Sequence, residues 1–201
     1  MEVPFLLRVS LPDVPGSLGR LASAIGQAGG DIEAIEIVEK TQSGSAVDDV
    51  LLEMGPGVMP DSIVSACNSL DGVEVLWISR YAAGGNLFLD LEAVEDLTAN
   101  PGEALDRVVD LLPVTFRVDW AARVTSDGSL GRSTGAGPTD VAWVALDRPT
   151  RLPDEDEMVL CGAPLGADTV VLGRRGGPEF LDSELARLGH LLGLALSINR
   201  A

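Results

Sequence analysis

The chain has 201 residues, 46% hydrophobic and 22% charged, so it is long enough to bury one large core or two small ones. Its net charge of −17 repels phosphate backbones and anionic lipids, which argues against direct binding to nucleic acid or to a membrane surface. No apolar run is long enough to span a bilayer, and the N-terminal segment lacks the features of a signal peptide, so we expect a cytoplasmic protein.

The first eighty residues predict strands and helices in the order β-α-β-β-α-β. An apolar strand over 5–11 stops at the Pro-Gly turn of residues 12–16, and Ser17 is the expected N-cap of an amphipathic helix over 18–28. The later elements are expected as a strand over 31–40 with a bulge at Ala34–Ile35, a strand over 46–54, a helix over 60–70 and a strand over 73–80. Right-handed crossovers then place both helices on one face of an antiparallel sheet, the ferredoxin-like arrangement.

The pattern changes after a Gly-rich linker over 83–86, which separates an expected domain over 1–82 from one over 87–201. The second domain is expected to contain helices over 87–97 and 102–112, strands over 114–124, 140–146, 158–165 and 168–175, and a long helix over 179–199. This order predicts an antiparallel sheet with flanking helices. The whole chain is therefore expected to be an α+β protein of two domains.

One stretch of the first domain carries a family resemblance. The pattern D-x-P-G-x-L over 13–18, the helix after it and G-G-D-I over 29–32 resemble the ACT domain family of small-molecule-binding regulatory modules, over residues 4–81. The resemblance implies that an amino acid binds in the turn, at an interface between two copies of the chain. It also implies that Gly30, Asp31 and Ile32 form the opposite wall of the site.

The residues of the turn have the chemistry that an amino acid requires. Pro15 stiffens the turn, and Gly16 lets the backbone come close to a ligand. The amides of Gly16, Ser17 and Leu18 lie at the positive end of a helix and suit a carboxylate, while Asp13 can face an ammonium group. The predicted ligand-binding residues are Asp13, Val14, Pro15, Gly16, Ser17, Leu18, Gly30, Asp31 and Ile32.

A simpler interpretation of the same residues stays open. Asp13 can serve only to accept backbone amides, and Asp31 only to begin a strand. In that case the domain is a dimerisation module that binds no ligand.

The remaining reactive side chains do not form a catalytic set. Asp48 and Asp49 are adjacent in a strand and face opposite ways, so we expect one exposed acid and one at an edge or interface. His190 lies among leucines of the last helix, which is typical of a helix-face residue. Cys67 and Cys161 have no metal-site spacing and are expected to be reduced and partly buried. We therefore expect no enzyme activity, no metal and no cofactor.

Two loops and the second domain also have informative sequence patterns. The acidic run over 152–157 predicts a solvated loop, with a cation site as the alternative, and the Gly-rich segment over 126–138 predicts a flexible loop rather than a phosphate cradle. Residues 87–199 resemble a shortened GAF-like sensor domain in their element order and long terminal helix. In such domains that helix often helps to build a dimer.

The sequence thus favours a non-catalytic, homodimeric sensor whose ACT domain binds a small metabolite, most simply an amino acid. Two alternatives remain: a structural or protein-interaction module without a ligand, and a regulatory subunit of a separate metabolic enzyme or regulator. Loss of ligand binding in Asp13→Ala with an intact dimer would separate the sensor from the structural module.

Overall fold

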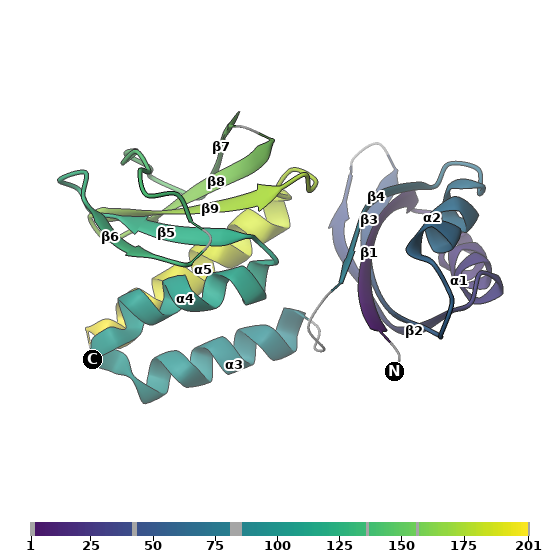
Figure 1. The fold of residues 1–201 in the computed structure, drawn as a ribbon, viewed down its shortest axis with the longest axis horizontal. Coiled ribbons are helices and arrows are strands. Elements are labelled where there is room, and N and C mark those ends of the chain that lie inside the picture. The colour runs from purple at the N-terminus through teal and green to yellow at the C-terminus, as the bar shows by residue number, and fades with distance from the viewer. Residues whose placement is uncertain (1–2, 42–43, 81–85, 136, 156, 201) are drawn as a thin grey trace. The chain divides into compact units, whose positions relative to one another are not determined.

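The computed structural model describes residues 3–41, 44–80, 86–135, 137–155 and 157–200 (Figure 1). The chain divides into two compact units, Met1–Gly85 and Asn86–Ala201. Residues 83–85 of the expected linker lie outside the described residues, whereas Asn86 begins a helix. Each unit has its own antiparallel sheet and its own helices, so the protein is a mixed α+β structure.

The first unit contains four strands and two helices among its described residues. They are β1 (Val3–Pro12), α1 (Ser17–Gln27), β2 (Gly30–Lys40), β3 (Ser45–Met54), α2 (Pro60–Asn68) and β4 (Glu74–Arg80). The sheet order is β2-β3-β1-β4, every neighbouring pair is antiparallel, and both helices cover the same face (Figure 1). The element order expected from the sequence is present, but a topology of this kind is shared by unrelated functions and assigns no family.

The core of the first unit lies between the two helices and the sheet. Alternate residues of the central strands, including Leu7, Val9 and Val50, point to this side and pack with Leu21 of α1 and Ile63 of α2. A strand directs successive side chains to opposite faces, so the same alternation sends the intervening residues of β1 and β3 to the other side of the sheet.

Two local expectations for this unit need correction. Gly16, with φ of 91°, is the N-cap of α1, and Ser17 is the first helical residue rather than the cap. Only a residue that tolerates a left-handed backbone can make this turn, so the helix begins one position earlier than predicted. The bulge of β2 falls between Ile32 and Ala34, and a second follows between Ile37 and Glu39.

The second unit contains a five-stranded sheet and three α-helices in the part of the chain that the structure describes. Its elements are α3 (Asn86–Ala99), the 3-10 turn η1 (Pro101–Glu103), α4 (Ala104–Phe116), β5 (Trp120–Val124), β6 (Leu130–Ser133), β7 (Thr150–Glu155), β8 (Met158–Leu165), β9 (Asp168–Arg175) and α5 (Asp182–Asn199). The strand order is β6-β5-β9-β8-β7. Helices α4 and α5 cover one face of this sheet, and α3 packs against both of them (Figure 1).

The expectation of a strand beginning at residue 114 is wrong. Helix α4 continues through Pro113 to Phe116, because Val108, Leu112 and Phe116 recur at helical spacing and are all buried in the core of this unit. Arg117, with φ of 51°, then ends the helix in the left-handed conformation. Burial of one helical face therefore overrides the alternating pattern of the sequence.

Three further expectations for the second unit are corrected by strand pairing. The segment 140–146 forms no strand, and the edge position is taken by β7, which contains the start of the acidic run expected to be a loop. Strand β6 lies within the Gly-rich segment and pairs with β5.

Among the described residues, no helix is long and apolar enough to cross a membrane.

Candidate functional site

A cavity of about 300 Å³ opens beside the turn between β1 and α1. The turn itself lines it from residue 11 to residue 18, and the sheet contributes Ile37 of β2 with Ala46 and Asp48 of β3. A volume of this size is at the lower end for small-molecule sites and suits a metabolite as small as one amino acid. All six predicted site residues of the turn, Asp13, Val14, Pro15, Gly16, Ser17 and Leu18, therefore lie at one cavity.

The backbone of the turn suits an anionic group. A Cβ at Gly16 would meet nothing within 4 Å, so the space beside this residue is open to a ligand. No side chain of the described residues caps the N-terminus of α1. The Ser17 amide donates to the Val14 carbonyl at 3.2 Å. The amides that follow it in the first turn have no partner within the helix and lie at the positive end of its dipole, so they favour a carboxylate.

Asp13 is already paired at the mouth of this cavity. Lys40 Nζ donates to Asp13 Oδ1 at 3.1 Å and to Oδ2 at 2.9 Å, and both side chains are exposed. Strands β1 and β2 run in the same direction on either side of β3, so Lys40 at the end of β2 reaches Asp13, which follows β1. Lys40 is not among the predicted site residues, although it is the single lysine of the chain and ends a strand beside the predicted hairpin.

Asp48 is the buried acid of this cavity. It lies opposite Val9 on one side and Ile37 on the other, on the sheet face that the helices cover, and only 1% of its surface is exposed. Its Oδ1 accepts no hydrogen bond from any described residue. Burial raises the pKa of Asp48, the carboxylates of Asp13 and Asp49 raise it further, and the Lys40 ammonium opposes them.

Asp49 occupies the other face of the sheet and has a structural partner. Arg8 Nε donates to Asp49 Oδ1 at 2.7 Å and Arg8 Nη2 donates to Asp49 Oδ2 at 2.9 Å, and both side chains are 2% exposed. The expectation of one exposed acid and one acid at an edge or interface is therefore wrong for both Asp48 and Asp49. Each lies in β3, which is a central strand with paired neighbours on both sides.

Ser17 adds a second buried polar atom to the lining. The residue is 3% exposed, and its Oγ has no hydrogen-bond partner among the described residues. Buried hydroxyl and carboxylate oxygens are normally satisfied, and leaving them unsatisfied costs free energy. The lining therefore combines a carboxylate with one unsatisfied oxygen, an unsatisfied hydroxyl and a helix N-terminus without a side-chain cap.

Gly30, Asp31 and Ile32 do not lie at this cavity within one chain. Gly30 pairs with Met54, at the far end of β3 from Asp48, and the six intervening steps of the strand measure about 20 Å. A Cβ on Gly30 would lie 2.7 Å from Ile25 Cγ2, so this glycine is needed for packing against α1. The opposite wall within the chain is formed by the sheet residues of the cavity instead.

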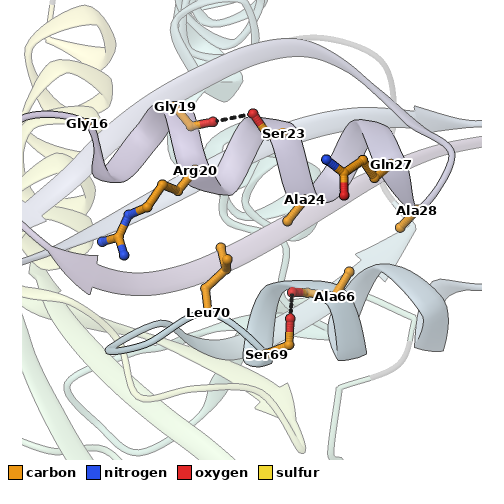
Figure 2. Close-up of a pocket in the computed structure, with 10 residues that line it drawn as sticks. All are labelled: Gly16, Gly19, Arg20, Ser23, Ala24, Gln27, Ala28, Ala66, Ser69 and Leu70. Carbon is orange, nitrogen blue, oxygen red and sulfur yellow. Dashed lines mark hydrogen bonds between the residues drawn. The ribbon is translucent and has the colours of Figure 1, made fainter.

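A larger hollow of about 660 Å³ lies between α1 and α2 (Figure 2). Its hydroxyl groups are satisfied within their own helices. Ser23 Oγ donates to the Gly19 carbonyl at 2.8 Å, and Ser69 Oγ donates to the Ala66 carbonyl at 2.7 Å (Figure 2). This hollow therefore lacks the unsatisfied buried groups that distinguish the smaller cavity.

The other candidate residues lie apart from both hollows. Within the described ranges, no three His, Cys, Asp or Glu side chains gather as a metal site. His190 is exposed on α5. Cys67 and Cys161 are fully buried, and burial raises the pKa of the Cys67 thiol to about 11 and that of the Cys161 thiol still further. A thiol in such surroundings stays protonated and is a poor nucleophile.

Comparison with solved structures finds weak similarities, of which two illustrate the range. The chain is similar to the GAF domain of an Acinetobacter phosphoenolpyruvate-protein phosphotransferase, with a TM-score of 0.45 and 16% identity over 59% of this chain and 95% of that chain. It is also similar to an unknown protein from Galdieria sulphuraria, with a TM-score of 0.36 and 13% identity over 100% of this chain and 93% of that chain. No protein-family model and no curated protein matches the sequence. Similarities at these TM-scores assign no family.

Proposed function

We propose that this protein is a non-catalytic, cytoplasmic sensor that binds one small amino acid in the cavity beside the β1–α1 turn. The observation that carries the proposal is the lining of that cavity, which offers an uncapped helix N-terminus together with carboxylates. A zwitterion needs donors for its carboxylate and acceptors for its ammonium group a few ångströms apart, and this lining supplies both.

The sequence resemblance to ACT domains supports the same hypothesis and also predicts that the protein is a homodimer. Val14, Leu18 and Ile37 line the cavity and are exposed apolar side chains, which suits a surface covered by a second copy. In such a dimer, Asp31 and its neighbours would reach the cavity only from the partner chain. Ligand binding would then favour the paired state and pass the signal to the GAF-like C-terminal unit or to a partner enzyme or regulator.

The test is a thermal-shift screen of the protein against the twenty standard amino acids, followed by calorimetry. A ligand at a hundred times its Kd should add about 2.7 kcal/mol to the free energy of unfolding. Asp13→Ala is expected to abolish this stabilisation by the ligand. The change removes a carboxylate from the mouth of the cavity and with it the ion pair that holds Lys40 there.

Two control variants sharpen this screen. Asp71→Ala changes an exposed acid that is not among the residues lining the cavity and should leave binding intact. Asp31→Ala tests whether a second copy of the chain completes the site. Binding is unchanged if one chain forms the whole site, and it weakens if Asp31 of a second copy forms the opposite wall. Absence of any stabilising amino acid would overturn the proposal.

One observation favours a second candidate function. The exposed apolar side chains at the mouth of the cavity also suit a protein-interaction module that dimerises and binds no metabolite. Sedimentation of the ligand-free protein tests this candidate. A stable dimer that Leu18→Ser dissociates, in a protein that no amino acid stabilises, would support the interaction module.

A further inference from the structure

The floor of the cavity, rather than its mouth, contains the acid with a buried oxygen that accepts no hydrogen bond from the described residues. The Asp13 side chain is 41% exposed and the Lys40 side chain 56% exposed, and the two neutralise each other. Asp48 is 1% exposed and lies between the apolar residues Val9 and Ile37 in adjacent strands. The carboxylate with the greatest need of a cation is therefore the deep one.

A buried carboxylate without a partner is expensive, because it loses hydration and gains nothing in return. Lys40 only partly offsets the cost of burying Asp48, because its ammonium donates to both oxygens of Asp13, at 2.9 and 3.1 Å, rather than to Asp48. The neighbouring Asp49 shows the usual solution, which is a two-point contact with Arg8. An acid that stays unsatisfied beside a cavity is instead available for a ligand.

We propose that Asp48, together with Ser17, binds the ammonium group of the ligand at the floor of the cavity, and that the ligand carboxylate points outward to Lys40 and the first amides of α1. This inference rests on the proposed function and determines the orientation of the ligand. An ammonium group has three donors and no acceptor, and the Asp48 carboxylate and the Ser17 hydroxyl both present acceptor oxygens to it. Asp13 then acts as a positioning residue that holds Lys40 at the mouth.

The orientation has a chemical consequence for specificity. A site that buries an acid to receive an ammonium rejects an analogue that lacks one, because the acid is then left unsatisfied. The 2-hydroxy acid with the same side chain as the bound amino acid should therefore bind at least about tenfold more weakly. The amine that lacks the carboxylate should also bind more weakly, because it loses the contacts at the mouth.

The experiment measures binding of the most stabilising of the twenty amino acids, its 2-hydroxy acid and its decarboxylated amine by calorimetry. The proteins are the full-length wild type, Asp48→Asn and Ser17→Ala. We expect Asp48→Asn to weaken binding of the amino acid at least about tenfold and to abolish the preference for it over the hydroxy acid. Ser17→Ala should weaken binding by a smaller factor.

The possible failures are distinguishable. If an amino acid binds wild type and Asp48→Asn equally, the proposed function stands and the role of Asp48 is overturned. Equal binding of the amino acid and its hydroxy acid to wild type overturns the role without any variant, so the test does not depend on the folding of Asp48→Asn. Equal binding of the decarboxylated amine overturns the outward carboxylate. If no amino acid binds wild type, the proposed function fails and this inference fails with it.

Discussion

Asp48 and Asp49 are chemically identical neighbours in β3 with opposite energetic roles. Asp49 is held by Arg8 on one face of the sheet, whereas Asp48 faces the cavity with an unsatisfied oxygen on the other. A binding site often sacrifices stability for function, because groups arranged for a ligand are strained or unsatisfied without it. Substituting Asp48 and Asp49 one at a time therefore tests which of the two acids stabilises the fold.

Asp48→Asn is expected to raise the free energy of unfolding of the ligand-free protein at neutral pH by about 1 kcal/mol, because it removes a buried charge with an oxygen that accepts no hydrogen bond from the described residues. Asp49→Asn should lower it by about 3 kcal/mol, because it weakens a buried ion pair. Urea unfolding of both variants measures the two changes. Equal destabilisation by both changes would contradict the assignment of different roles.

The pH dependence of stability tests the burial of Asp48 independently. Its pKa is raised above the ordinary value of 3.8, chiefly by burial, so the folded protein binds this proton more tightly than the unfolded chain. The contribution of Asp48 to stability is therefore fully present below pH 3.8 and is lost as the pH rises through the raised pKa.

The difference in unfolding free energy, wild type minus Asp48→Asn, should accordingly fall as the pH rises from 3.8 through the raised pKa of Asp48, and then level off. Urea unfolding of both proteins at a series of pH values measures this difference. Subtracting the variant from the wild type removes the contributions of the other acids, which both proteins share. A constant difference would mean that Asp48 titrates normally in the folded protein.

At the scale of elements, tertiary contacts decide where helices begin and end. Helix α5 illustrates this, because its first turn is joined to the end of β9. Arg174 Nη2 donates to Glu184 Oε1 at 2.9 Å and to the Phe116 carbonyl at 3.1 Å, and the guanidinium lies 4.4 Å from the centre of the Phe180 ring. Glu184 Oε2 also accepts from the Leu181 amide at 2.8 Å, which caps α5. A single buried acid thus links the helix to the sheet.

Glu184→Gln should lower the free energy of unfolding by about 3 kcal/mol, because it removes the charge that partners buried Arg174. Asp182→Asn is the matched control, since Asp182 lies in the same helical turn but forms an exposed pair with Arg151. Exposed pairs contribute little, so this control should change stability far less. Thermal and urea unfolding measure both variants, and similar losses from the two would refute a special role for Glu184.

The accuracy of the predicted elements follows from how local their signals are. The Pro-Gly turn and the apolar spacing of α1 act within a few residues, so residues 13–18 could be placed together from the sequence. The segment from Val114 could not, because its alternation is compatible with a strand until the buried face of α4 extends through it. Strand β7 was missed because its pairing with β8, rather than its own acidic composition, makes it a strand.

At the scale of the whole molecule, the chain forms two units, and the candidate site lies in the first of them. All residues that line the cavity belong to β1, the turn after it, α1, β2 and β3. The residues proposed to bind the ligand therefore all belong to the first unit.

The sequence by itself determined the order of elements in the first unit, the turn before α1 and the chemistry that the turn offers, because proline, glycine and apolar periodicity act locally. Only the tertiary structure decided which groups meet that turn. The register of β2 on β3 places Lys40 against Asp13 and Asp48 at the cavity floor, and it moves Gly30–Ile32 to the far end of the sheet. Register depends on pairing between residues distant in sequence, and a shift of one position would turn Asp48 to the opposite face.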